Sequence, residues 1–199
     1  MVQKLDTLQE TASQTAGPYV HIGLMPTHAG NAGAYDEEVG TSPIADGALG
    51  EIIEITGSVF DGTGFVLRDA VLESWQADAN GIFPGQDDAD PNVTGHCRFA
   101  ADADTGEFTL RTVKPGTTRL RDGRVQAPHI AIWIVARGIN IGLDTRIYFE
   151  DEDNADDPLL SRIEQRQRVD TLIAKKTGKG RYRFDIRLQG DGETVFLDM

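Results

Sequence analysis

Residues 182–188, YRFDIRL, alternate apolar and polar side chains without a break. This two-residue period is typical of a β-strand with one buried face. A Gly-Asp-Gly turn at 190–192 follows, and ETVFLD then returns as a further strand. Upstream, PHIAIWIVARG (128–138) has few polar breaks, which indicates a strand buried on both faces. These stretches predict a fold that is mainly β.

Short apolar runs bounded by turns continue through most of the chain. EIIEITGSVF (51–60), a turn at 61–64 and FVLRDAVLESWQA (65–77) predict one β-hairpin, and residues 96–113 predict a second around ADADTG. TRIYFED (145–151) predicts another strand. The expected architecture is a β-sandwich of two mostly antiparallel sheets with about seven to nine strands.

One helix is predicted, in the C-terminal half. Pro158 opens LLSRIEQRQRVDTLIAKK (159–176), in which apolar residues recur at roughly helical spacing. Residues 1–50 lack sustained helical or strand periodicity, so we expect an extended N-terminal arm with loops. Residues 51–199 then form the sandwich domain, since 199 residues suffice for one core.

Charge and composition exclude several functions. Lys plus Arg number 19 and Asp plus Glu number 32, and the net charge of −13 repels nucleic acid and anionic membranes. No apolar stretch could span a bilayer, and the first residues lack the apolar core of a signal peptide, so we expect a cytoplasmic location. The single cysteine, Cys97, cannot form an internal disulfide or a multi-thiolate metal site.

The sequence contains no complete metal-binding motif. The acidic run DEDNADD (151–157) invites a calcium interpretation, but an EF-hand loop needs Gly at 156 and Glu at 162, where the chain has Asp and Arg. We therefore expect a solvated loop there. The four histidines show no paired spacing that would put two imidazoles on one strand face or one helix turn.

Several stretches, in order, resemble the intradiol ring-cleaving dioxygenases. They are SQTAGPYVHIG (13–23), WQADANG (75–81), VKPG (113–116), APHI (127–130), RIYFEDE (146–152) and YRFDIRLQGDGETVF (182–196). The resemblance implies a β-sandwich and is strongest to the α type of chain, which pairs with a homologous β chain in a large hetero-oligomer. It further implies that non-haem Fe(III) is bound by the partner β chain.

The iron ligands that the family implies are missing from this sequence. Catalytic relatives hold iron with two tyrosines and two histidines, the second histidine two residues after the first on one strand. His129 stands at the first histidine position and Ala131 at the second, while Phe83 and Thr118 stand at the tyrosine positions. One ligand of four cannot hold iron, so the resemblance implies a chain that has lost its metal centre and is inactive alone.

The resemblance also implies that α chains lend residues to the substrate pocket of the β iron. In this sequence they are Thr15, Gly17, Pro18, Tyr19 and Arg137. The substrate would be protocatechuate (3,4-dihydroxybenzoate), which O2 cleaves to 3-carboxy-cis,cis-muconate. Because that substrate is anionic, the pocket needs a cation that stays charged when partly buried, as arginine does. The glycine lets backbone approach a ligand, the proline fixes the turn, and the hydroxyl groups orient the substrate.

Plainer interpretations stay open at this level. Without the resemblance, Arg137 is a surface residue at a strand end, Gly17-Pro18-Tyr19 is an ordinary turn, and His129 is a hydrogen-bonded core histidine. Trp75 and Trp133 are expected to pack in the core. The rival to an enzyme subunit is a non-catalytic β-sandwich binding module that retains the dioxygenase scaffold, and a third reading is a self-sufficient iron dioxygenase.

Overall fold

The computed structural model describes residues 15–36, 40–140 and 142–198. Its strands, in chain order, are β1 (Ile52–Phe60), β2 (Val71–Trp75), β3 (His96–Ala100), β4 (Glu107–Val113), β5 (Thr118–Arg119), β6 (Val125–Gln126), β7 (His129–Val135), β8 (Leu143–Phe149), β9 (Ile173–Gly178), β10 (Arg181–Arg183) and β11 (Ile186–Arg187). Eight strands form one hydrogen-bonded path, β11-β1-β10-β9-β8-β7-β2-β3, and a ninth, β4, pairs with β1 beside it; β5 pairs with β6 separately. The mainly β prediction is confirmed.

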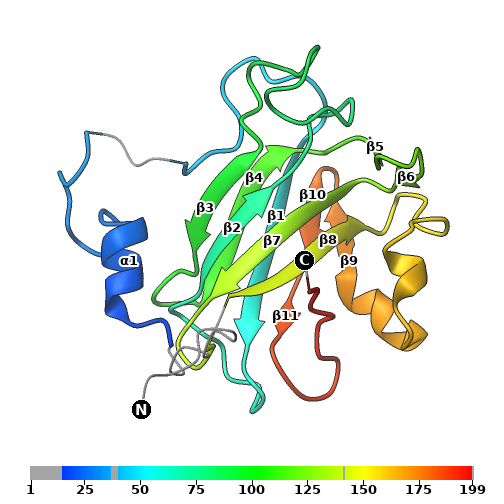
Figure 1. Ribbon diagram of the computed structural model, residues 1–199. Helices are drawn as coiled ribbons and strands as arrows, with labels where there is room; N and C mark the ends of the chain where they lie inside the picture. The colour runs from blue at the N-terminus through cyan, green and yellow to red at the C-terminus, as the bar shows by residue number, and fades with distance from the viewer. Residues whose placement is uncertain (1–14, 37–39, 141, 199) are drawn as a thin grey trace, which may run out of the picture.

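The path of strands folds over on itself into a sandwich (Figure 1). One half contains β4, β1 and β10, and the other contains β3, β2, β7 and β8. Strand β9 joins them, since it pairs antiparallel with β10 and parallel with β8. One core cluster takes side chains from both halves, among them Ile55 and Phe108 from the first and Leu72, Ile132 and Ile147 from the second. The two halves therefore bury their inner faces against each other.

Strand β7 shows how the faces divide. Ile130, Ile132 and Ile134 are buried in the core, whereas Ala131 and Trp133 are half-buried on the opposite face. The expectation of a strand buried on both faces is therefore wrong for most of its length. Its apolar outer residues face a partly covered surface.

The two predicted hairpins are not formed as expected. The turn at 61–64 is present, but after the bridge between Phe60 and Val66 the chain crosses over, and β2 pairs with β3 and β7 instead of β1. In the same way β3 pairs with β2, while β4 pairs with β1 in the other half. Alternation identifies a strand, but it does not say which half of a sandwich the strand joins.

The predicted C-terminal-half helix is replaced by two short 3-10 helices, η1 (Leu160–Arg162) and η2 (Arg166–Leu172), followed by strand β9. Ile163 has an extended backbone between the two, which prevents a continuous α-helix. The apolar spacing serves a second core cluster instead, in which Leu160 and Leu172 pack with Ala127 and Tyr148. The segment is helical and covers the sandwich, but in a different form from the one expected.

The arm contains an α-helix that the sequence pattern does not reveal. Helix α1 (Pro18–Leu24) begins with proline, whose fixed φ and missing N–H suit the first helical turn. Seven residues are too few to show a helical period, so the segment was expected to be extended. No helix among the described residues is long and apolar enough to cross a bilayer.

Strand β1 contains a glycine at a point of close backbone contact. Gly57 lies in β1 where an added Cβ would fall 1.8 Å from the carbonyl oxygen of Phe184, so only glycine fits.

Asp157, expected in a solvated loop, is buried. Its Oδ1 accepts hydrogen bonds from the backbone N–H groups of Leu159 and Leu160, and its Oδ2 from that of Ala127.

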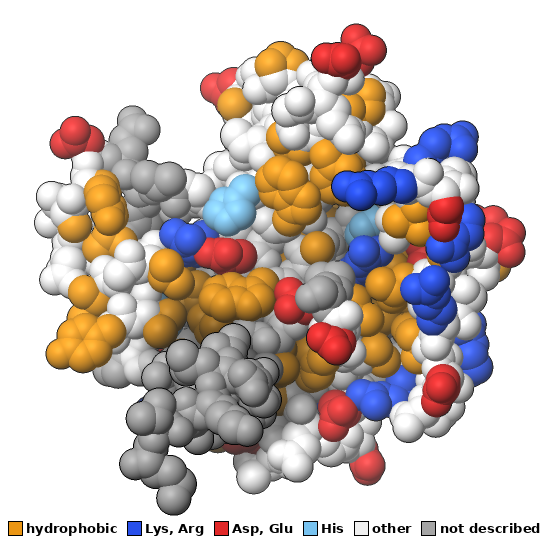
Figure 2. Space-filling view, viewed as in Figure 1, with side chains coloured by type: hydrophobic (Ala, Val, Ile, Leu, Met, Phe, Trp, Pro, Cys, Tyr) orange, Lys and Arg blue, Asp and Glu red, His pale blue; other side chains and the backbone are white. Residues whose placement is uncertain are grey.

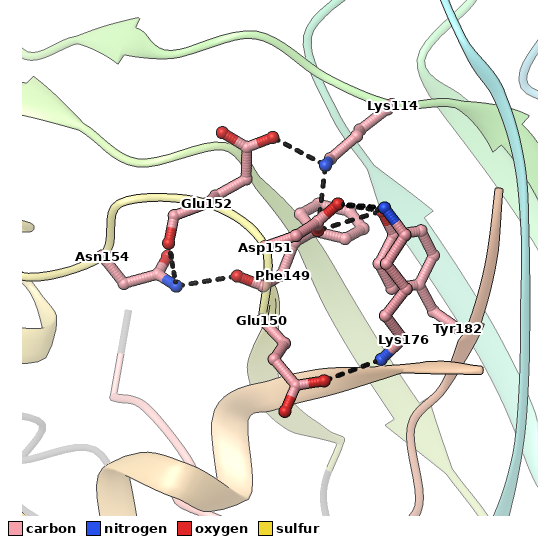
Figure 3. A network of polar contacts seen from close by, with 8 residues as sticks. All are labelled: Lys114, Phe149, Glu150, Asp151, Glu152, Asn154, Lys176 and Tyr182. Carbon is pink, nitrogen blue, oxygen red and sulfur yellow. Dashed lines mark hydrogen bonds and ion pairs between the residues drawn. The ribbon is translucent and has the colours of Figure 1, made fainter. Parts of the chain in front are cut away.

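A network of charges ties the two halves together where β4, β8, β9 and β10 meet (Figure 3). Lys114, just after β4, places its Nζ 3.0 Å from Asp151 and 2.6 Å from Glu152, the residues that follow β8. Lys176 and Tyr182 also reach Asp151, with Nζ–Oδ2 and OH–Oδ1 distances of 2.6 and 3.0 Å. The first residues of the acidic run, Asp151 and Glu152, therefore belong to an ion-pair network, and its last residue, Asp157, is a buried hydrogen-bond acceptor.

Candidate functional site

A turn at the end of β7 brings the arm and the sandwich together. Arg137 follows the strand, and Gly138 has φ +88°, a left-handed conformation that favours glycine. The Gly138 N–H donates a hydrogen bond to Oγ1 of Thr15, with an N–O distance of 2.8 Å. Thr15 and Arg137, 122 positions apart in the sequence, thus lie at the same turn.

The guanidinium of Arg137 forms an ion pair with Asp69, a residue of the sandwich. Its Nε lies 3.3 Å from Oδ2 of Asp69, a residue in the turn before β2. The Arg137 side chain is nonetheless 76% exposed. Oδ1 of Asp69 is buried and has no hydrogen-bond partner within the described part of the chain. Asp69 was not singled out from the sequence, since nothing in its local pattern marks it.

An open hollow of about 390 Å³ lies between helix α1 and this turn. Gly17, His21, Asp69 and Arg137 line it together with the apolar residues Ala16, Ile22 and Ala29. A small molecule with an aromatic ring and a negative charge matches such a lining, because the apolar wall accepts the ring and the guanidinium accepts the charge.

The expected pocket residues are brought together only in part. Gly17 and Arg137 line the hollow, Thr15 bonds to the turn that contains Arg137, and the backbone of Pro18 starts helix α1 beside it. Tyr19 is 84% exposed and does not line the hollow. On the face drawn in Figure 2, hydrophobic side chains are exposed over α1, at the left. This distribution leaves α1 with an uncovered apolar side.

His21 is a further polar residue of the hollow that sequence reasoning missed. Burial, and then the neighbouring His28, lower its pKa, while Asp69 acts in the opposite direction. The two imidazole rings stack with centroids 5.7 Å apart. His21 therefore presents a mainly neutral imidazole at neutral pH, able to donate or accept a hydrogen bond.

The four positions at which the sequence resemblance places the family's iron ligands lie elsewhere, toward the other end of β7. Phe83 and Thr118 line one hollow of about 490 Å³ with Arg119 and Gln86. Trp75, 43% exposed, stacks on Phe83 with ring centroids 6.1 Å apart, so the expectation that it packs in the core is wrong.

His129 is buried at the start of β7. Its Nδ1–H donates to the carbonyl oxygen of Ala127 over 2.7 Å, and its ring lies 5.7 Å from that of Tyr148. Burial, and then the charge of Arg146, lower the pKa of His129 to about 4. It is a hydrogen-bonded core histidine, which agrees with the plainer interpretation of the sequence.

The residues at these positions do not fit ferric iron. Ala131 is opposite Trp75 on β2 and Arg146 on β8, so a fixed positive charge stands beside the methyl group where a second imidazole is expected. A phenyl ring, an aliphatic hydroxyl and a methyl group cannot replace two phenolates and an imidazole. Within the described residues, no three of His, Cys, Asp and Glu gather as a possible metal site.

Comparison with known proteins identifies the family. A family model described as Dioxygenase matches residues 25–190, and the chain is 51% identical over 199 residues to the protocatechuate 3,4-dioxygenase alpha chain of Pseudomonas putida, covering 98% of each. The chain belongs to the intradiol ring-cleaving dioxygenase family. The resemblance stated from the sequence motifs is thereby confirmed.

Two other members of the intradiol family extend the comparison. The protocatechuate 3,4-dioxygenase beta chain of Burkholderia cepacia is 32% identical over 182 residues, which cover 83% of this chain and 77% of that one. The solved structure of 3-chlorocatechol 1,2-dioxygenase from Rhodococcus opacus has a TM-score of 0.56 at 23% identity, over 74% of this chain and 64% of that one. The second likeness concerns the fold, and it agrees with the sandwich described above.

Proposed function

We propose that this chain is the α subunit of a protocatechuate 3,4-dioxygenase, and that it completes the substrate pocket of an iron-bearing β subunit in a large hetero-oligomer. The assembled enzyme would cleave protocatechuate with O2 to 3-carboxy-cis,cis-muconate, and this chain alone would be inactive. The observation that carries the proposal is the 51% identity to an alpha chain over 98% of both chains.

We further propose that the chain binds no iron of its own. The donor set at Phe83, Thr118, His129 and Ala131 supports this, and so does the cation Arg146 beside Ala131. A trivalent cation placed next to a guanidinium would be repelled. The Fe(III) of the complex would then belong to the β subunit.

The hollow beside α1 supports the assignment of the substrate-contacting residues. Arg137 and Gly17 line it, and Thr15 bonds to the same turn. We assign Arg137 to the binding of the negative charge of the substrate, and Thr15, Gly17 and Pro18 to the pocket wall that the arm forms. Tyr19, which does not line this hollow, is assigned to the part of that wall that meets the β subunit. Residues 1–50 would then act as an arm at the subunit interface, and residues 51–199 as the dioxygenase-like sandwich.

Co-expression with a homologous β chain tests the subunit assignment. We expect both chains to co-purify as a coloured complex with protocatechuate-cleaving activity, and iron analysis of this chain expressed alone to find none. A colourless single species that associates with no β chain would instead favour a binding module, and ferric iron in the isolated chain would favour a self-sufficient enzyme. Fractionation of cells would test the expected cytoplasmic location.

Arg137→Ala tests the pocket in the reconstituted complex. Hydrogen bonds to charged groups contribute about 1.5–3 kcal/mol, so we expect the KM for protocatechuate to rise about 10-fold or more with the iron content unchanged. Unaltered kinetics would remove Arg137 from the pocket.

A further inference from the structure

Asp69 and Arg137 form an ion pair at the mouth of the hollow beside α1. We propose that Asp69 is a positioning residue, which holds the Arg137 guanidinium by its Nε so that the two terminal nitrogens face the carboxylate of the substrate. This proposal rests on the proposed function, because it assigns Asp69 a task in the same pocket.

The geometry of the pair supports the proposal. A guanidinium carries five N–H donors in a rigid plane, and the contact with Asp69 over 3.3 Å is made by Nε. Both terminal nitrogens thereby keep their four N–H donors for a second, bidentate contact with a planar carboxylate. Among the described residues, Asp69 is the group that pairs with Arg137.

Arg137 needs such a support because its side chain is largely exposed. An arginine side chain has several rotatable bonds, and part of their freedom is lost when a ligand fixes the side chain. A pairing that restrains the side chain beforehand reduces this loss on binding. The turn itself is held by the Gly138 N–H to Thr15 bond, so the backbone and the side chain of this turn have separate anchors.

The charge of Asp69 also has an opposing effect, so the direction in which KM changes shows whether the charge or the restraint is the larger effect. A carboxylate beside the guanidinium weakens its attraction for an anion, so removal of that charge alone would tighten substrate binding. Removal of the restraint would weaken binding. Oδ2 of Asp69 makes the ion pair with Arg137, whereas its buried Oδ1 has no hydrogen-bond partner within the described residues.

The test is Asp69→Asn in the reconstituted complex, since asparagine keeps the shape and removes the charge. Exposed ion pairs contribute up to about 1 kcal/mol, so we expect the KM for protocatechuate to rise about five-fold with kcat little changed. The KM for catechol, which lacks the carboxylate, should stay unchanged. Asp122→Asn, which breaks another exposed Asp–Arg pair in the turn between β5 and β6, is the matched control and should alter neither.

A double-mutant cycle separates the two proposals. If Asp69 acts through Arg137, Asp69→Asn should have no effect on KM in the Arg137→Ala background. A KM that falls or stays the same in Asp69→Asn, while Arg137→Ala raises it, would overturn the positioning role and leave the pocket assignment intact. If Arg137→Ala itself has no effect, the pocket assignment fails instead. A rise in the KM for catechol in Asp69→Asn would point to a merely structural role.

Discussion

At the residue scale, Asp157 is a buried residue within an acidic run that the sequence predicts to be solvated. It is the last residue of DEDNADD, but it is buried, and four groups from three segments donate hydrogen bonds to it, the fourth being the Tyr148 hydroxyl over 3.2 Å. A single carboxylate therefore accepts the backbone N–H groups at the start of η1, holds the chain before β7 and anchors a buried phenol. Its neighbour Asp156 is exposed.

Asp157→Ala should lower the free energy of unfolding by about 3 kcal/mol, because it leaves several buried donors without an acceptor. Asp156→Ala is the matched control and should change it by less than about 0.5 kcal/mol. Urea unfolding of both variants would measure this. Equal stabilities of the two would mean that the carboxylate is not the anchor of this segment.

His129 should make stability depend on pH in a defined window. Its pKa is about 4 in the folded chain against an ordinary value of 6.5, so the unfolded chain binds the proton more readily between these values. The contribution of the neutral imidazole is complete above pH 6.5 and is lost as pH falls toward 4, by on the order of 3 kcal/mol.

Urea unfolding at pH 7, 5.5 and 4.5 checks the prediction. His129→Asn should lose much less stability than the parent chain over this range. Parallel pH profiles of the parent and His129→Asn would show that the imidazole does not titrate as described.

At the element scale, the Lys114 network joins strands that belong to opposite halves. The Lys114 side chain is 11% exposed and lies over the rings of Phe149 and Tyr182, with its Nζ 5.3 and 5.5 Å from their centroids. Burial acts to lower the pKa of Lys114, but pairing with Glu152, Tyr182 and Asp151 outweighs it and raises that pKa. The amine therefore stays charged inside the network.

Lys114→Met should lower the free energy of unfolding by about 2 kcal/mol, because it leaves Asp151 and Glu152 with less compensation while it fills the same space. Lys175→Met, which removes a mostly exposed partner of Glu150, should cost less than about 0.5 kcal/mol. Thermal unfolding of both variants gives the comparison. Equal losses would mean that Lys114 acts only as a surface charge.

The elements also show how far the sequence alone leads. Strand β7 and the alternating stretch after Arg181 were predicted from local periodicity, which a strand expresses in its own residues. The pairing partners of β2 and β4 were not predicted, because they depend on which half of the sandwich each strand joins after the loop before it. The same limit applies to the hollow beside α1. Family motifs in the sequence predict Arg137 and Gly17 as pocket residues, whereas Asp69 and His21 are brought next to them only by the fold.

At the scale of the whole molecule, charge and apolar surface are unevenly distributed. In Figure 2 basic side chains gather along the right edge, where β5, β6 and the segment after β8 lie, even though the chain carries a net charge of −13. The apolar side chains Tyr19 and Ile22 are exposed on α1. An uncovered apolar surface of this kind suits a face that a partner subunit buries.

Tyr19→Ala should therefore separate folding from assembly. Since its side chain is 84% exposed, the variant should unfold within about 0.5 kcal/mol of the parent chain. In the complex with the β chain we expect weaker association, measured by gel filtration of serially diluted samples. Val125→Ala, at an exposed apolar site on β6, is the control, and equal dissociation of both variants would argue against α1 as the interface.

Arg146 has a consequence for any attempt to build an iron site into this chain. A histidine introduced at Ala131 would lie opposite Arg146 on the adjoining strand, and the charge of that guanidinium would oppose a bound cation. Two more ligands would still be missing at Phe83 and Thr118. A histidine or tyrosine introduced at any one of these positions would therefore leave the set of two tyrosines and two histidines incomplete, so an iron site could be engineered here only by several substitutions made together.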